Sequence, residues 1–221
     1  MLGDVYHEGI IFHLNILEDD YSFFHSTLSQ FIQDEKTVNG ILELYDIFPN
    51  TPHDVLLGRF EHMAGDAIFK ILNFITAILS SDLQQKESLF TYHFDQRSRL
   101  KNPLEGTAYH AHELLYLFLN LTNKMNEAEI LMAHRFAEAW ISFVYGEKPW
   151  KAEKEQWMVW GQDSKFGVVS EGQDEKIRGY VRMKKIVEMA GGEVWKKWLL
   201  GIDAIVNKRM RLGTMIVSQA H

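Results

Sequence analysis

The sequence has no cysteine among its 221 residues. This absence excludes disulfide bonds and thiol chemistry, and it favours a reducing compartment such as the cytoplasm. Positive charge is also scarce, because 23 Lys and Arg stand against 30 Asp and Glu, which gives a formal net charge of −7. A chain with this balance has no electrostatic basis for binding nucleic acid, so no nucleic-acid partner is expected.

Long hydrophobic runs are missing as well. The longest apolar stretch, residues 71–79, is interrupted by Asn73 and Thr76. A helix that crosses a bilayer needs about 20 apolar residues, so we expect no transmembrane segment. The first residues do not resemble a signal peptide either, because Asp4 follows Met1 closely within a predicted strand.

The composition is that of a packed globular protein. Hydrophobic residues make up 46% of the chain, aromatic residues 13% and charged residues 24%. These proportions argue against disorder, and the length suits one domain or slightly more.

One segment, residues 106–118, has the properties of a loop that presents a catalytic histidine. It reads GTAYHAHELLYLF, so Gly106 starts a turn, His110 follows, and an apolar run anchors the turn in a core. Most histidines near apolar residues have a structural role, and His112 is expected to support the loop or face solvent. A zinc site at His110 and His112 is not expected, because no His-Glu-x-x-His helix and no cysteine accompany them.

This segment resembles the histidine loop of the type-B carboxylesterase and cholinesterase family. That loop has Gly, two variable residues, His, usually Gly, a variable residue and Glu. His110 stands three residues before Glu113 and so takes the catalytic place, while three residues rather than two separate it from Gly106. Ala111 stands where the family usually has Gly. Residues 1–12 resemble the acid loop of the same family, with Glu8 on the catalytic acid and His7 in place of the usual Asp.

The resemblance implies an α/β fold class, namely the C-terminal part of an α/β-hydrolase. The acid loop precedes the histidine loop, as it does in this fold. The resemblance covers residues 1–190, and residues 191–221 are expected to form a helical basic tail outside it. The Gly-x-Ser-x-Gly elbow that holds the nucleophile is absent, since its nearest imitation, residues 167–172, has Val168 in place of the first Gly.

Hydrophobic periodicity and breaker residues predict the secondary structure. Strands are expected over residues 1–6, 89–94, 157–160 and 165–170. Helices are expected over 20–48 with a break near Gly40, over 54–83, over 126–145 with Asn126 as its cap, over 174–189, and over 193–211.

The function that the resemblance implies is carboxylic-ester hydrolysis by a serine esterase. Glu8 and His110 would be two members of a Ser-Glu-His triad whose serine is absent from the chain, so the chain is expected to be inactive alone. It would need no cofactor and no metal, and it would act on a small-molecule ester once an upstream half completed it. Any signal peptide would lie in that missing part, and self-association or binding of an upstream fragment is expected. The alternative is a non-catalytic, esterase-like protein-interaction module.

Overall fold

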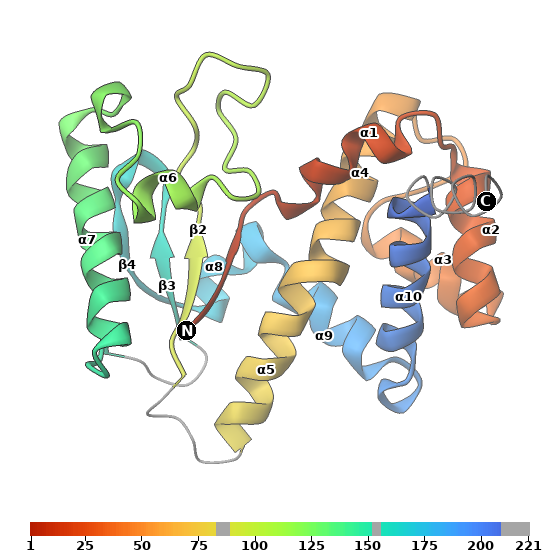
Figure 1. Ribbon diagram of the computed structural model, residues 1–221. Coiled ribbons are helices and arrows are strands. Elements are labelled where there is room, and N and C mark those ends of the chain that lie inside the picture. The colour runs from red at the N-terminus through yellow and green to blue at the C-terminus, as the bar shows by residue number, and fades with distance from the viewer. Residues whose placement is uncertain (83–88, 152–155, 209–221) are drawn as a thin grey trace, which may run out of the picture. The chain divides into compact units, whose positions relative to one another are not determined.

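The computed structural model describes residues 1–82, 89–151 and 156–208 (Figure 1). The chain forms two compact units, and each of them is assembled from two chain segments. Met1–Glu8 and Leu72–Tyr180 form the first, which we call the sheet unit. Gly9–Ile71 and Val181–His221 form the second, which we call the helical unit.

The sheet unit contains a four-stranded sheet with the order β1-β2-β3-β4. Its strands are β1 (Leu2–Val5), β2 (Thr91–Phe94), β3 (Gln156–Trp160) and β4 (Phe166–Ser170). The first three are parallel, and β4 returns antiparallel to β3 as a hairpin. The four predicted strands are therefore confirmed, and the hairpin covers the edge of β2 that faces away from β1.

The core of this unit packs β2 against α7 (Glu127–Val144). All four residues of β2 are buried, and the Tyr92 and Phe94 rings lie 5.4 and 5.6 Å from the ring of Phe136 on α7. Gly3 on β1 is required by close packing, because a Cβ there would lie 2.0 Å from Cζ of Tyr92.

Besides α7 and α8 (Glu171–Arg178), the described part of the sheet unit contains α6 (Glu113–Leu117) and two short 3-10 helices, Thr122–Lys124 and Gln162–Ser164. As predicted, Asn126 caps α7, in a capping box with Glu129. The single helix expected over 174–189 is wrong. Gly179, with a φ of +67°, ends α8 before α9 (Tyr180–Glu188) begins.

The remaining elements lie in the helical unit or cross into it. The 3-10 helix Glu8–Phe12, α5 (Ile71–Asp82) and α9 each begin in one unit and end in the other. The others are α1 (His13–Ile16), α2 (Tyr21–Ile32), α3 (Glu35–Leu44), α4 (His53–Gly65), the π-helix Asp66–Lys70, the 3-10 helix Met189–Gly192 and α10 (Val194–Val206).

The core of the helical unit packs α2 against α4 and α10. Phe24 of α2 stacks on Phe60 of α4 with ring centroids 3.9 Å apart, and Trp198 of α10 is fully buried. The predicted break near Gly40 is wrong, since Gly40 lies inside α3. The chain breaks at Gln33, which has a φ of 60°, because Asp34 then caps α3 by accepting from the Thr37 N–H. The last three residues of the helix expected over 193–211 lie outside the described residues.

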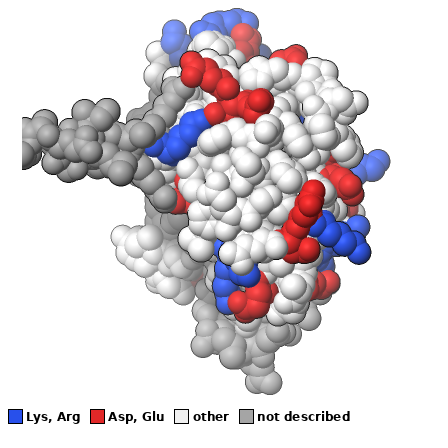
Figure 2. All heavy atoms as spheres, turned by 90° about the vertical axis from the view of Figure 1, so that its right-hand side faces the viewer, with Lys and Arg blue, Asp and Glu red and all other residues white. Residues whose placement is uncertain are grey.

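Two surface properties bear on possible partners. The helical stretch His53–Ser80 is long and apolar enough to cross a membrane by length and composition, although buried core helices pass the same test and 44% of its most apolar window is buried. On the face drawn in Figure 2, acidic and basic side chains lie intermixed around a broad uncharged area.

Candidate active site

The acid loop turns Glu8 back onto the strand that precedes it. Oε1 of Glu8 accepts a hydrogen bond of 2.7 Å from the backbone N–H of Val5, the last residue of β1. Glu8 is only 5% exposed, so this bond holds its carboxylate in a buried position. The next residue must be glycine, because a Cβ on Gly9 would lie 1.7 Å from the carbonyl oxygen of Glu61.

The histidine loop brings His110 to the other oxygen of this carboxylate. Nδ1 of His110 lies 2.5 Å from Oε2 of Glu8, although 102 positions separate the two residues in the chain. The backbones of the two loops are also joined, since the His7 N–H donates to the Ala108 carbonyl at 2.9 Å and His7 bridges Tyr109 in parallel. The structure thus brings together the two residues that the sequence predicted for the site.

The electrostatics of the pair favour a proton on His110. The hydrogen bond that His110 donates to Glu8 raises the pKa of His110 above its ordinary value, and partial burial opposes this only in part. Because Nδ1 donates its proton to Glu8, Nε2 carries the lone pair of the neutral ring and can accept a proton. The His110 side chain is 35% exposed, so a reacting group can approach it.

Glu113, three residues after His110, is a second carboxyl group with a perturbed pKa. Burial raises the pKa of Glu113 above its usual range, and the charge of Glu8 adds to this effect. Its Oε2 is buried without a hydrogen-bond partner. Burial and the charge of Glu8 thus both disfavour the ionised form of Glu113.

His112 supports the loop. It is 2% exposed, its Nδ1 donates to the Gln96 carbonyl over 3.1 Å, and its ring stacks on Tyr109. Burial lowers the pKa of His112 to about 4, so the ring is neutral near pH 7. This agrees with the supporting role expected from the sequence.

Ala111 adopts a backbone conformation that favours glycine. Its φ is +64°, in the left-handed region. The family usually has Gly at this place in the loop, and the geometry supplies the reason. A residue with a Cβ in this region costs about 1 kcal/mol or more.

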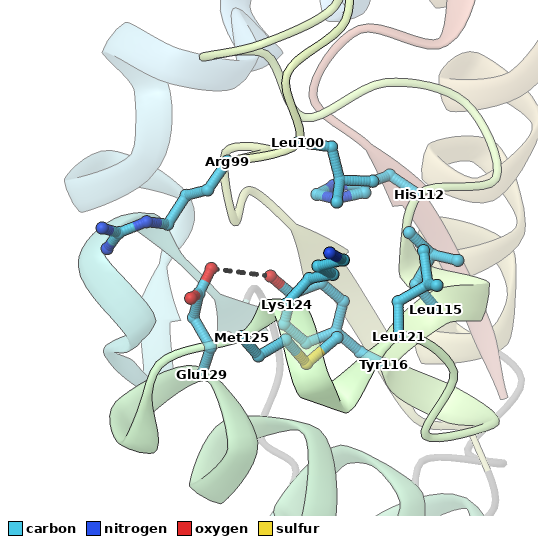
Figure 3. Close-up of a pocket in the computed structure, with 9 residues that line it drawn as sticks. All are labelled: Arg99, Leu100, His112, Leu115, Tyr116, Leu121, Lys124, Met125 and Glu129. Atoms are coloured by element: carbon cyan, nitrogen blue, oxygen red, sulfur yellow. Dashed lines mark hydrogen bonds between the residues drawn. The ribbon is translucent and has the colours of Figure 1, made fainter.

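A small cavity lies behind the histidine loop (Figure 3). Its volume is about 20 Å³, and its walls include His112, Tyr116 and Glu129, with Tyr116 Oη donating to Glu129 over 3.2 Å. A larger cavity of about 360 Å³ lies between Asp95, the β3–β4 hairpin and Ile177. Neither of these two cavities is lined by Glu8 or His110, so neither identifies a substrate pocket.

Two features near these loops were missed by the sequence analysis. A buried ionic cluster forms around Arg178, and a second histidine–carboxylate pair, His13 Nδ1 with Glu61 Oε1 at 2.5 Å, lies in the helical unit. Asp4 within a buried strand was the one available signal, because a buried charge requires a partner. Nothing local in the sequence identified that partner.

Comparisons with known proteins identify a family and a fold. Residues 6–187 match the model of a family described as "Carboxylesterase family". Among solved structures, the chain is similar to a PNB esterase (19% identity, TM-score 0.55, covering 82% of this chain and 37% of that one). It is also similar to EstA of Aspergillus niger (16% identity, TM-score 0.56, covering 84% and 39%).

At these identities the likeness establishes the fold alone, and it confirms the expected partial α/β-hydrolase fold. The chain spans less than two fifths of the length of these solved esterases. A search of curated proteins found no match.

Proposed function

This chain belongs to the carboxylesterase family, and on that premise we propose that Glu8 and His110 are the acid and the base of a Ser-Glu-His triad in a carboxylic-ester hydrolase. The observation that carries the proposal is the 2.5 Å contact between Glu8 Oε2 and His110 Nδ1. The second Glu8 oxygen is fixed by the Val5 N–H, so the carboxylate has a defined direction toward the imidazole.

The chemistry follows from the two ring nitrogens. Glu8 holds the proton on Nδ1, so Nε2 takes the proton of a serine hydroxyl as that oxygen attacks the ester carbonyl. The imidazolium formed in this step is stabilised by the carboxylate, and it later protonates the leaving alcohol. The raised pKa of His110 is consistent with this use of the charged form.

We propose that the serine comes from residues outside this sequence, and the absence of a Gly-x-Ser-x-Gly segment supports this. We propose that the same missing part supplies the backbone donors that bind the oxyanion. The substrate class is a small-molecule ester. Its acyl and alcohol groups would be recognised largely by that other part.

The experiment that tests the proposal uses this chain joined to a segment that carries a Gly-x-Ser-x-Gly elbow. In that enzyme, His110→Ala should reduce turnover on the order of 10⁶-fold and Glu8→Gln on the order of 10⁴-fold, as losses of a triad histidine and acid do. Turnover of an aryl ester at saturating substrate is the measurement.

The chain provides a matched control in His13 and Glu61. Their contact has the same 2.5 Å length, and their exposures (43% and 4%) are close to those of His110 and Glu8 (35% and 6%). His13→Ala and Glu61→Gln should leave turnover near the wild-type value. Equal losses at His13 and His110 would refute the assignment. A complete protein without any esterase activity would favour the non-catalytic interaction module.

A further inference from the structure

Arg178, the last residue of α8, lies at the centre of a buried ionic cluster in the sheet unit. The cluster consists of Asp4, His93, Asp95, Asp174 and Arg178, each between 1% and 4% exposed. Nη1 of Arg178 donates to Asp4 over 2.6 Å, and Nη2 donates to Asp95. Burial lowers the pKa of Arg178, but the charges of Asp95 and Asp4 raise it by more, so the guanidinium stays charged.

One arm of this guanidinium reaches the backbone that holds the catalytic acid. Leu2 and Tyr6 donate their N–H groups toward β2, so by alternation the backbone groups of Gly3 and Val5 point to the opposite edge of β1. There Asn73 donates to the Gly3 carbonyl over 2.8 Å, and Arg178 Nη1 donates to the Val5 carbonyl over 3.3 Å.

The N–H of Val5 donates to Glu8 Oε1 over 2.7 Å. Val5 therefore connects Arg178 directly to Glu8 through its own two backbone groups. Side chains therefore bind three backbone groups on this edge of β1, namely the Gly3 carbonyl and both backbone groups of Val5.

The other arm reaches the strand that leads to the histidine loop. Asp95 directly follows β2, and its N–H donates to the Trp160 carbonyl of β3 over 2.7 Å. The next residue, Gln96, accepts the hydrogen bond from His112 of the histidine loop. A single planar guanidinium thus joins the ends of the acid strand and the histidine strand.

We propose that Arg178 is a positioning residue for the Glu8–His110 pair, because its two arms fix the strand ends from which the acid and histidine loops depart. This inference rests on the proposed function for its meaning in catalysis. The planar arrangement of the guanidinium donors matters as well as the charge. A lysine ammonium on a flexible side chain cannot bind Asp4, the Val5 carbonyl and Asp95 in one fixed geometry.

Arg178→Lys tests the proposal, because it keeps the positive charge and removes the planar set of guanidinium donors. The readout is the pH dependence of His110 modification by diethyl pyrocarbonate, which reacts with the neutral imidazole, measured by peptide mass spectrometry on the full chain. We expect the midpoint for His110 to fall by about half a pH unit, since a displaced carboxylate stabilises the imidazolium less. His134, which is exposed on α7, reports the reactivity of the reagent.

Arg182→Lys is the matched control. Arg182 Nη2 donates over 2.7 Å to buried Asp66 in the helical unit, so this variant also weakens an arginine–aspartate pair. It should leave the His110 midpoint unchanged. An unchanged His110 midpoint in Arg178→Lys, or equal shifts in the two variants, would overturn the inference and leave Arg178 with a structural role only.

A second variant, Arg178→Met, separates geometry from charge. Arg178→Met removes the positive charge of the guanidinium and leaves the negative charges of Asp4 and Asp95. If charge alone determined the pKa of His110, this change would stabilise the imidazolium and raise the His110 midpoint. Loss of position lowers the midpoint, so a rise contradicts the proposal and a fall supports it. If Arg178→Met does not fold, Arg178→Lys decides alone.

Glu8→Gln distinguishes this inference from the proposed function. It must lower the His110 midpoint in an otherwise unchanged chain. If Glu8→Gln has no effect, the assignment of the acid itself is wrong. If Glu8→Gln lowers the midpoint and Arg178→Lys does not, only the role of Arg178 is wrong.

Discussion

Replacing Glu8 with Gln should destabilise the sheet unit in a way that depends on pH. Gln keeps an oxygen that can accept from the Val5 N–H, so the perturbation is largely confined to the contact with His110. A hydrogen bond between charged groups contributes about 1.5–3 kcal/mol. Because 35% of the His110 side chain is exposed, screening reduces this, and we expect a cost of about 1 kcal/mol.

The sign of the pH dependence follows from the raised pKa of His110. A histidine whose pKa is raised on folding stabilises the protein fully below its unfolded value of about 6.5, and the contribution is lost as the pH rises through the folded value. The cost of Glu8→Gln should therefore be largest near about pH 6 and smaller near about pH 9.

The assay is hydrogen–deuterium exchange in increasing urea, followed on peptides that cover β1 and residues 106–112. A chain with two compact units need not unfold in one step, and peptide resolution assigns the change to the sheet unit. Comparing variant and wild type at the same pH cancels the intrinsic pH dependence of exchange.

Glu61→Gln removes the matched contact in the helical unit and should leave the sheet-unit peptides unchanged. An equal cost of Glu8→Gln at both pH values, or a larger one at high pH, would refute the reasoning.

Three further predictions concern the isolated chain. Ala111→Gly should stabilise the sheet unit by about 0.5–1 kcal/mol, because glycine tolerates a φ of +64° without strain, and a lower unfolding midpoint would contradict this. The chain alone should not hydrolyse aryl esters above a matched blank, since loss of the nucleophile costs on the order of 10⁶ in rate, and labelling of any residue by a serine-directed phosphonate would show otherwise. β1 is a terminal strand of the described sheet, so we expect the chain to associate with itself or with an upstream segment, although side chains bind the Gly3 and Val5 backbone groups on this edge; a stable monomer in light scattering at micromolar concentration would argue against it.

The elements of the fold that depend on near neighbours were predictable from the sequence. Asn126 followed by acidic residues and an apolar stripe predicted α7, and the structure has its capping box there. The aromatic and β-branched content of residues 89–94 predicted β2, and two short runs around a polar turn in residues 157–170 predicted β3 and β4. Glu8 and His110 could be predicted as site residues because each lies in a short segment whose residue order resembles one family.

Other features required the tertiary structure. Arg178 and Asp4 lie 174 positions apart, and no local pattern identifies one as the partner of the other. The break was predicted at Gly40, but it lies at Gln33, where Asp34 caps the next helix and Gly40 stays within that helix. The burial of each histidine could not be predicted from its sequence neighbours either. In the structure His112 is buried and supports the loop, whereas the His110 side chain is 35% exposed. Local propensity depends on residues that are close in the sequence. The partners of buried charges depend on which distant segments pack together in the folded core.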